Sequence, residues 1–136
     1  MTDDFSPTND IVIIDDEPAI RRVLTHLLSI HGYTASAAGN GEEGLALVRA
    51  IRPRIVFCDV TMPGMNGHEV CTQIKGDPTL TNTHVIMLTA SLHQNDRDRA
   101  VQSGADEFMP KPFSPREVAE RVRSVLSLPE ALAAAA

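Results

Sequence analysis

Five residues with metal-binding or reactive side chains stand at or just after the ends of apolar segments. Asp15 and Asp16 follow one continuous apolar run, Asp59 follows a second, Thr89 a third, and Lys111 comes shortly after a fourth. Continuous apolar runs of this length are typical of strands in parallel sheets that are covered on both faces. Because such sheets bind ligands outside the carboxyl ends of their strands, we expect the five side chains to share one edge of a sheet.

The three carboxylates predict a site for a hard divalent cation. Two carboxylates about 5 Å apart repel each other by roughly 3 kcal/mol at an effective dielectric constant of about 20, so a cluster must take up a proton or a cation. Oxygen ligands in this number suit Mg²⁺. A carboxylate such as Asp59 can also be a nucleophile that forms an aspartyl phosphate. Lys111 would then neutralise phosphoryl oxygens, and Thr89 would donate its hydroxyl hydrogen to one of them.

The elements that must position these residues alternate between strand and helix, which predicts a parallel sheet with right-handed crossovers. The predicted strands are 11–14, 33–37, 55–58, 85–88 and 107–109. The first helix is expected to begin at Pro18 and to stop at Gly32. Its buried face is predicted to consist of five aliphatic residues at helical spacing: Ile20, Val23, Leu24, Leu27 and Leu28.

Four further helices are predicted between and after the remaining strands. The second begins at Asn40 or Gly41, and the third follows the Pro- and Gly-containing loop 61–67 and runs to about Lys75. The fourth is expected over 96–104. The fifth is expected to begin with Pro at its first position and a capping box between Ser114 and Glu117.

The composition indicates one acidic domain with an aliphatic core. The 136 residues are 43% hydrophobic and 4% aromatic, and their formal net charge of −6 argues against direct nucleic-acid binding as the main role. The sequence contains neither an apolar stretch of membrane-spanning length nor the pattern of a signal peptide, and two cysteines are too few for a disulfide framework. We therefore expect a cytoplasmic protein with a tail at 1–9, a domain at 10–127, and a tail or the start of a linker at 128–136.

Four motifs together resemble the receiver domain of two-component response regulators. They are the runs 11–17 (IVIIDDE) and 59–67 (DVTMPGMNG), the pair Thr89-Ala90, and 111–113 (KPF), and the resemblance extends over residues 10–127. It implies a doubly wound, flavodoxin-like α/β fold with a five-stranded parallel sheet in the order 2-1-3-4-5.

The resemblance also implies a role for each residue of the acidic site. Asp59 would be the phosphoacceptor. Asp16 and Asp59 would bind Mg²⁺ directly, Thr61 would contribute its backbone carbonyl, and Asp15 would act through a water molecule. Gly64 and Gly67 are expected to serve the backbone geometry of the acceptor loop.

Three further residues receive roles in recognising the phosphoryl group and responding to it. Thr89 and Lys111 would contact the phosphoryl group. Phe108 would be a switch aromatic that turns inward when Thr89 moves, and the Lys111-Pro112 peptide bond would be cis.

The implied function is phosphorylation-dependent signalling rather than turnover of an outside metabolite. The phosphoryl group would come from the phosphohistidine of a sensor histidine kinase or phosphotransfer protein. The output would be a downstream protein or a fused domain, and a partner or a second copy would dock on the face formed by 96–104, 107–109 and 114–126. The segment 75–81 resembles stand-alone receivers, or those fused to signalling enzymes, more than those fused to DNA-binding domains.

Two other functions remain open at this point. One is a metal-dependent phosphohydrolase with an aspartyl nucleophile, but such enzymes carry a second acid where this chain has Thr61. The other is a receiver-like binding module that works without phosphate, although such modules usually lose an acid or the lysine, and this chain keeps them all.

Overall fold

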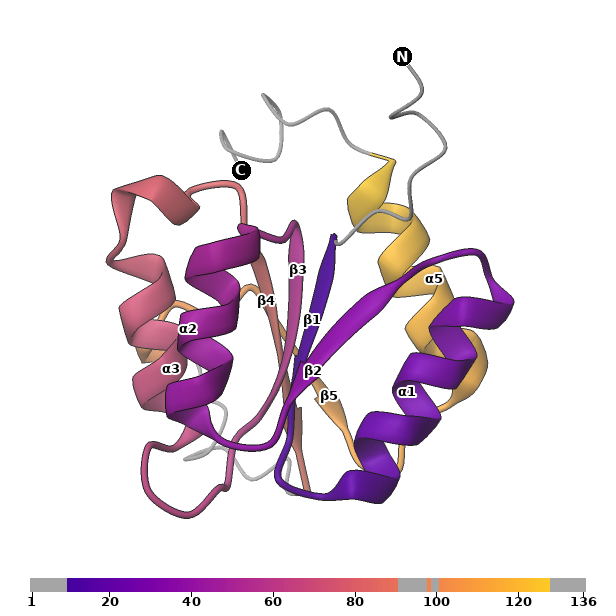
Figure 1. Ribbon diagram of the computed structural model, residues 1–136, viewed down its shortest axis with the longest axis horizontal. Helices are drawn as coiled ribbons and strands as arrows, with labels where there is room; N and C mark the ends of the chain where they lie inside the picture. Colours follow the sequence, from indigo (N-terminus) through magenta and orange to yellow (C-terminus); the bar gives the residue numbers. More distant parts are fainter. Residues whose placement is uncertain (1–9, 91–97, 99–100, 128–136) are drawn as a thin grey trace.

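Five parallel strands form a sheet with helices on both faces (Figure 1). The structure is a computed structural model and describes residues 10–90, 98 and 101–127. The predicted tails at 1–9 and 128–136, and residues 96, 97, 99 and 100 of the helix predicted over 96–104, lie outside the described residues; residues 98, 101 and 102 of that segment are helical. The strands are β1 (Ile11–Ile14), β2 (Ala35–Ala38), β3 (Ile55–Asp59), β4 (His84–Thr89) and β5 (Glu107–Pro110), in the predicted order β2-β1-β3-β4-β5.

Figure 1 shows α2 and α3 on one side of the sheet and α1 and α5 on the other. Their bounds are Pro18–Ile30 for α1, Gly41–Ile51 for α2, Gly67–Lys75 for α3 and Pro115–Leu126 for α5, and a short 3-10 helix spans Pro78–Leu80. The described helices are all too short or too polar to cross a bilayer.

The continuous apolar strands supply a core to each face because successive side chains point to opposite sides of a strand. Val12 and Ile14 pack on the side of α2 and α3, whereas Ile11 and Ile13 pack on the side of α1 and α5. All four are fully buried. The sheet is thus fixed from both sides, which gives its carboxyl edge a rigid base.

The first helix departs from its predicted face at Val23, which is 50% exposed. Leu24, Leu27 and Leu28 are buried as predicted. The prediction that Val23 is buried is therefore wrong. The part of α1 that the sheet covers is narrower than the row of apolar residues along the helix.

The second strand begins later than predicted because the end of α1 occupies the residues before it. Gly32 has a φ of +87° and its N–H donates to the Ser29 carbonyl, while the Tyr33 N–H donates to the Leu28 carbonyl. This pair of bonds is a Schellman motif. Tyr33 is thereby part of the helix end, and the strand runs over Ala35–Ala38 instead of 33–37.

Side-chain caps mark the beginnings of the other helices. Asn40 caps α2, as predicted, by accepting from the Glu43 N–H at 2.8 Å. Ser114 caps α5 by accepting from the Glu117 N–H, with Pro115 next. The full reciprocal box is found instead at Asn66 and Glu69, at the start of α3.

Candidate functional site

The carboxylates of Asp15, Asp16 and Asp59 converge at the carboxyl edge of the sheet. Strands β1 and β3 are neighbours, and their last paired residues before the acids are Ile14 and Cys58. Because these residues are paired, the acids that follow them lie side by side at the edge of the sheet. One carboxylate oxygen from each of the three residues lies within 4.8 Å of the others. Asp15 is fully buried, Asp59 is 6% exposed, and Asp16 is exposed to solvent.

Lys111 is the cation at the centre of this cluster. Its Nζ lies 2.9 Å from Asp15 Oδ2, 3.4 Å from Asp59 Oδ1 and 3.6 Å from Glu17 Oε1. The backbone N–H of Lys111 donates to the Thr89 carbonyl at 2.8 Å. The Lys111-Pro112 peptide bond is cis, as the resemblance implied. The lysine side chain is only 14% exposed, so its charge acts where solvent screens it weakly.

The electrostatic balance of the site leaves Asp59 unusually basic. The pKa of Asp59 is raised from 3.8 to about 6, chiefly by burial and then by the nearby Asp15, while Lys111 and the Thr61 N–H oppose the shift. Burial acts to lower the pKa of Lys111, but its bonds to Asp15 and its attraction to Asp59 outweigh burial and raise that pKa overall. The carboxylates thus exceed the positive charge available to them.

A divalent cation fits this imbalance. The ligand atoms are carboxylate oxygens, which hard cations such as Mg²⁺ prefer, and exposed Asp16 leaves one side of the cluster open to solvent. A cation there would offset the repulsion that raises the pKa of Asp59. Asp15, Asp16 and Asp59 are the residues that could hold it.

Thr61 and Thr89 flank the acid at the end of β3. The Thr61 N–H donates to Asp59 Oδ1 at 3.3 Å, so the loop after β3 folds back over the acid. Thr89 ends β4, one residue beyond the Leu88 that pairs with Asp59. It is 7% exposed and hence nearly enclosed.

The acceptor loop depends on Gly67, the first residue of α3. A Cβ added at Gly67 would lie 2.2 Å from the Asp59 carbonyl oxygen, a distance that no side chain tolerates. The Gly67 N–H donates to the Val60 carbonyl at 2.9 Å. Gly64 has a φ of +75°, a left-handed backbone conformation that glycine adopts without steric cost. The prediction that both glycines serve the backbone is confirmed.

Phe108 is half-buried in β5, paired in register with Met87 of β4. It packs against the core cluster beneath α2 and α3. This place is compatible with a core residue as well as with a switch, so its switch role stays a prediction.

Two residues near the acids were not singled out from the sequence. Glu17 lies 3.6 Å from the Lys111 amine, and Arg21 Nη1 donates to the Asp15 carbonyl at 2.8 Å. Both stand in the helix start that follows the acidic pair. Sequence spacing gave no signal for either one, because acids and arginines near a helix start are usually solvated.

Comparison with known proteins agrees with this arrangement. The response regulator receiver domain model matches residues 11–123. The chain is 42% identical to "Probable transcriptional regulator ycf27" of Porphyra purpurea over 85% of this chain and 46% of that protein. It is 37% identical to "DNA-binding response regulator MtrA" of Mycolicibacterium smegmatis over 85% of this chain and 50% of that one. The chain thus spans about half the length of these relatives.

Solved structures with the same fold include two receivers. The chemotaxis protein CheY4 of Vibrio cholerae superposes with a TM-score of 0.80 at 28% identity, covering 85% of this chain and 96% of that chain. The signal receiver domain of a histidine kinase from Syntrophus aciditrophicus gives 0.80 at 35% identity, covering 86% and 89%. With the fold, the acidic edge and the family match in agreement, this chain belongs to the response regulator receiver domain family.

Proposed function

We propose that this receiver domain takes a phosphoryl group onto Asp59 from the phosphohistidine of a sensor histidine kinase or phosphotransfer protein. The observation that carries the proposal is the convergence of three carboxylates within 4.8 Å, with Lys111 Nζ 3.4 Å from Asp59. A carboxylate oxygen of Asp59 attacks phosphorus, the phosphorus–nitrogen bond to the donor imidazole breaks, and an aspartyl phosphate forms. Water later cleaves that anhydride, which returns the carboxylate and releases phosphate.

The neighbouring residues would each have a defined part in this reaction. Mg²⁺, held by Asp15, Asp16, Asp59 and the Thr61 backbone carbonyl, would neutralise charge on the incoming phosphoryl oxygens. Asp16 and Asp59 would bind it directly, and Asp15 through water, since Asp15 is fully buried and already engaged by Lys111.

The amine and the hydroxyl would recognise the product. Lys111 would exchange part of its contact with Asp15 and Asp59 for a phosphoryl oxygen, and Thr89 would donate its hydroxyl hydrogen to another. Movement of Thr89 would then let Phe108 turn further into the core.

The enzyme alternative is weaker. A phosphohydrolase of the aspartyl type would need a general acid two residues after Asp59, and Thr61 there cannot supply one. A module that works without phosphate would have no use for a buried carboxyl whose pKa is raised to about 6 beside a lysine. The chain itself is therefore proposed to catalyse only its own phosphorylation and dephosphorylation, in the cytoplasm.

The output is proposed to lie outside residues 10–127. The relatives are about twice as long as the chain, and one of them is named as a DNA-binding regulator. Nucleic-acid binding would then belong to a fused domain rather than to this acidic one, and these relatives lend no support to the preference drawn from segment 75–81. The docking face for a partner or second copy is proposed to include β5 and α5.

The experiment is intact-mass analysis after incubation with acetyl phosphate, a small phosphodonor. The protein should gain one phosphoryl group in Mg²⁺ and almost none in excess chelator. Asp59→Asn should gain none under either condition, because an amide oxygen cannot form the acyl phosphate. Labelling of Asp59→Asn equal to that of the unaltered protein would refute the assignment.

A further inference from the structure

The peptide that joins Asp15 to Asp16 is held in place by an arginine from the next helix. Arg21 Nη1 donates to the Asp15 carbonyl at 2.8 Å, and on the other side the Asp15 N–H donates to the Ala38 carbonyl at 3.2 Å. The Asp15 side chain is fixed as well, since its Oδ1 accepts from the Glu17 N–H at 2.9 Å. Exposed Asp16, in contrast, is joined to this anchored residue by the peptide that Arg21 contacts.

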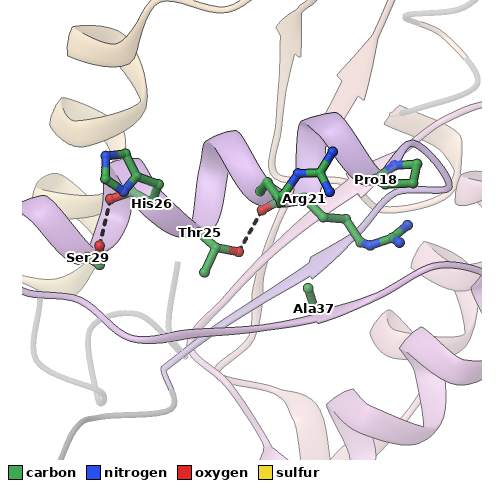
Figure 2. Close-up of a pocket in the computed structure, with 7 residues that line it drawn as sticks. Pro18, Arg21, Thr25, His26, Ser29 and Ala37 are labelled. Carbon is green, nitrogen blue, oxygen red and sulfur yellow. Dashed lines mark hydrogen bonds between the residues drawn. The ribbon is translucent and has the colours of Figure 1, made fainter.

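The guanidinium of Arg21 lies against Gly39, where the absence of a side chain leaves space for it. A Cβ added at Gly39, just after β2, would lie 3.1 Å from Arg21 Nη1 and 3.5 Å from its Cζ. Figure 2 shows Arg21 on the side of α1 that forms a groove with Ala37 of β2. Arg21 is half-buried there, whereas Arg22, which lines the same groove, is exposed.

Helix formation does not account for an arginine at this place. Arg21 is the fourth residue of α1, near the end of the helix that disfavours cations. Its guanidinium points a donor at a carbonyl instead of at an acid on its own helix. The contact that explains it is the one to Asp15.

We propose that Arg21 is a positioning residue for divalent-cation binding, because it fixes the Asp15–Asp16 peptide and so holds the Asp16 carboxylate beside Asp15 and Asp59. This inference rests on the proposed function, since it assumes that the three carboxylates bind Mg²⁺. It predicts that loss of the guanidinium weakens Mg²⁺ binding even though removal of a nearby positive charge should by itself strengthen binding.

The test is a calorimetric Mg²⁺ titration with a charge-matched control. Arg21→Gln should bind Mg²⁺ about tenfold more weakly, the lower end of the loss seen when partners of metal ligands are removed. Arg22→Gln removes the same charge one residue away, and its affinity should stay equal to or slightly above that of the unaltered protein. Arg21→Lys, which keeps the charge without the planar fork, should lie between.

A second variant reaches the same contact from the other side. Gly39→Ala places a methyl group against the guanidinium, so it should weaken Mg²⁺ binding to a smaller extent and add nothing in the Arg21→Gln background. Amide exchange of Asp16 and Glu17, measured without metal, should be faster in Arg21→Gln than in Arg22→Gln. This second readout does not depend on any ion.

The outcomes separate the two proposals. If the unaltered protein binds Mg²⁺ and Arg21→Gln matches Arg22→Gln in affinity and in amide exchange, Arg21 does not position the acids, and the proposed function is untouched. If the unaltered protein binds no Mg²⁺, the metal site itself is wrong, and the role of Arg21 is overturned with it.

Discussion

The two edges of the sheet both gather charged side chains, but only one of them balances its charges. At the amino edge, Lys75 pairs with Asp106, and His84 and Arg121 both lie against Glu107. Among the described residues of the carboxyl edge, the three carboxylates and Glu17 lie around the amine of Lys111, and the Arg21 guanidinium is directed at the Asp15 carbonyl rather than at a carboxylate. Opposite charges at the amino edge neutralise each other within the folded protein. The carboxyl edge keeps an excess of negative charge, so a bound cation would stabilise it further.

The charged side chains of the balanced edge also bind backbone groups. At the amino edge Asp106 Oδ2 accepts from the Val85 N–H at 2.8 Å, and Lys75 Nζ also donates to the Thr83 carbonyl at 2.9 Å. Arg54, which precedes β3, donates to the carbonyls of Val125 and Leu126 and so satisfies the end of α5. The difference indicates that one edge secures the fold while the other carries a stability cost that binding relieves.

The largest expected effect on stability comes from breaking the balanced edge. Asp106→Ala should lower the free energy of unfolding by about 2–3 kcal/mol, because the Val85 N–H, on a fully buried residue, loses its acceptor. Urea denaturation measures this. Asp106→Asn keeps an acceptor and should cost less. Glu120→Gln, at the exposed pair with Arg116, should change stability by less than about 0.5 kcal/mol. If Asp106→Ala were as stable as Glu120→Gln, the structural role that we assign to this edge would be wrong.

At the carboxyl edge, removal of an acid is expected to stabilise the protein instead. Without metal at pH 8, Asp59→Asn should raise the free energy of unfolding by about 1–2 kcal/mol, because it removes a buried charge that its surroundings penalise. Lys111 keeps its 2.9 Å contact with Asp15 in this variant. Urea denaturation in chelator is again the measurement, and a loss of stability would show that Asp59 is well accommodated as a charge.

The pH dependence sharpens the same comparison. The pKa of Asp59 is 3.8 ordinarily and about 6 in the fold, so between these values the folded state binds more protons than the unfolded state. Stability from this group is therefore present at low pH and is lost as pH rises through 6. In chelator, the stability gap between Asp59→Asn and the unaltered protein should widen from pH 4 to about pH 7 and then level off. A gap that stays constant over this range would contradict the raised pKa.

Much of this fold could be predicted because its strands are continuous apolar runs, and their ends then place the acids. The contacts between distant segments could not. Arg21 contacts the Asp15 carbonyl and Asp106 contacts Lys75, and both contacts involve charged side chains that are ordinary on any surface. The error at Val23 has the same origin, since periodicity shows which residues share a stripe and not how much of that stripe the sheet covers.

The most direct test of the unbalanced edge is to locate the phosphoryl group within it. Borohydride reduces an aspartyl phosphate to the alcohol homoserine and releases phosphate, which leaves a stable mark for peptide mass spectrometry. After incubation with acetyl phosphate and Mg²⁺, the account predicts homoserine at position 59 and aspartate unchanged at Asp15 and Asp16. Homoserine at either of those two positions, or at none of the three, would contradict it.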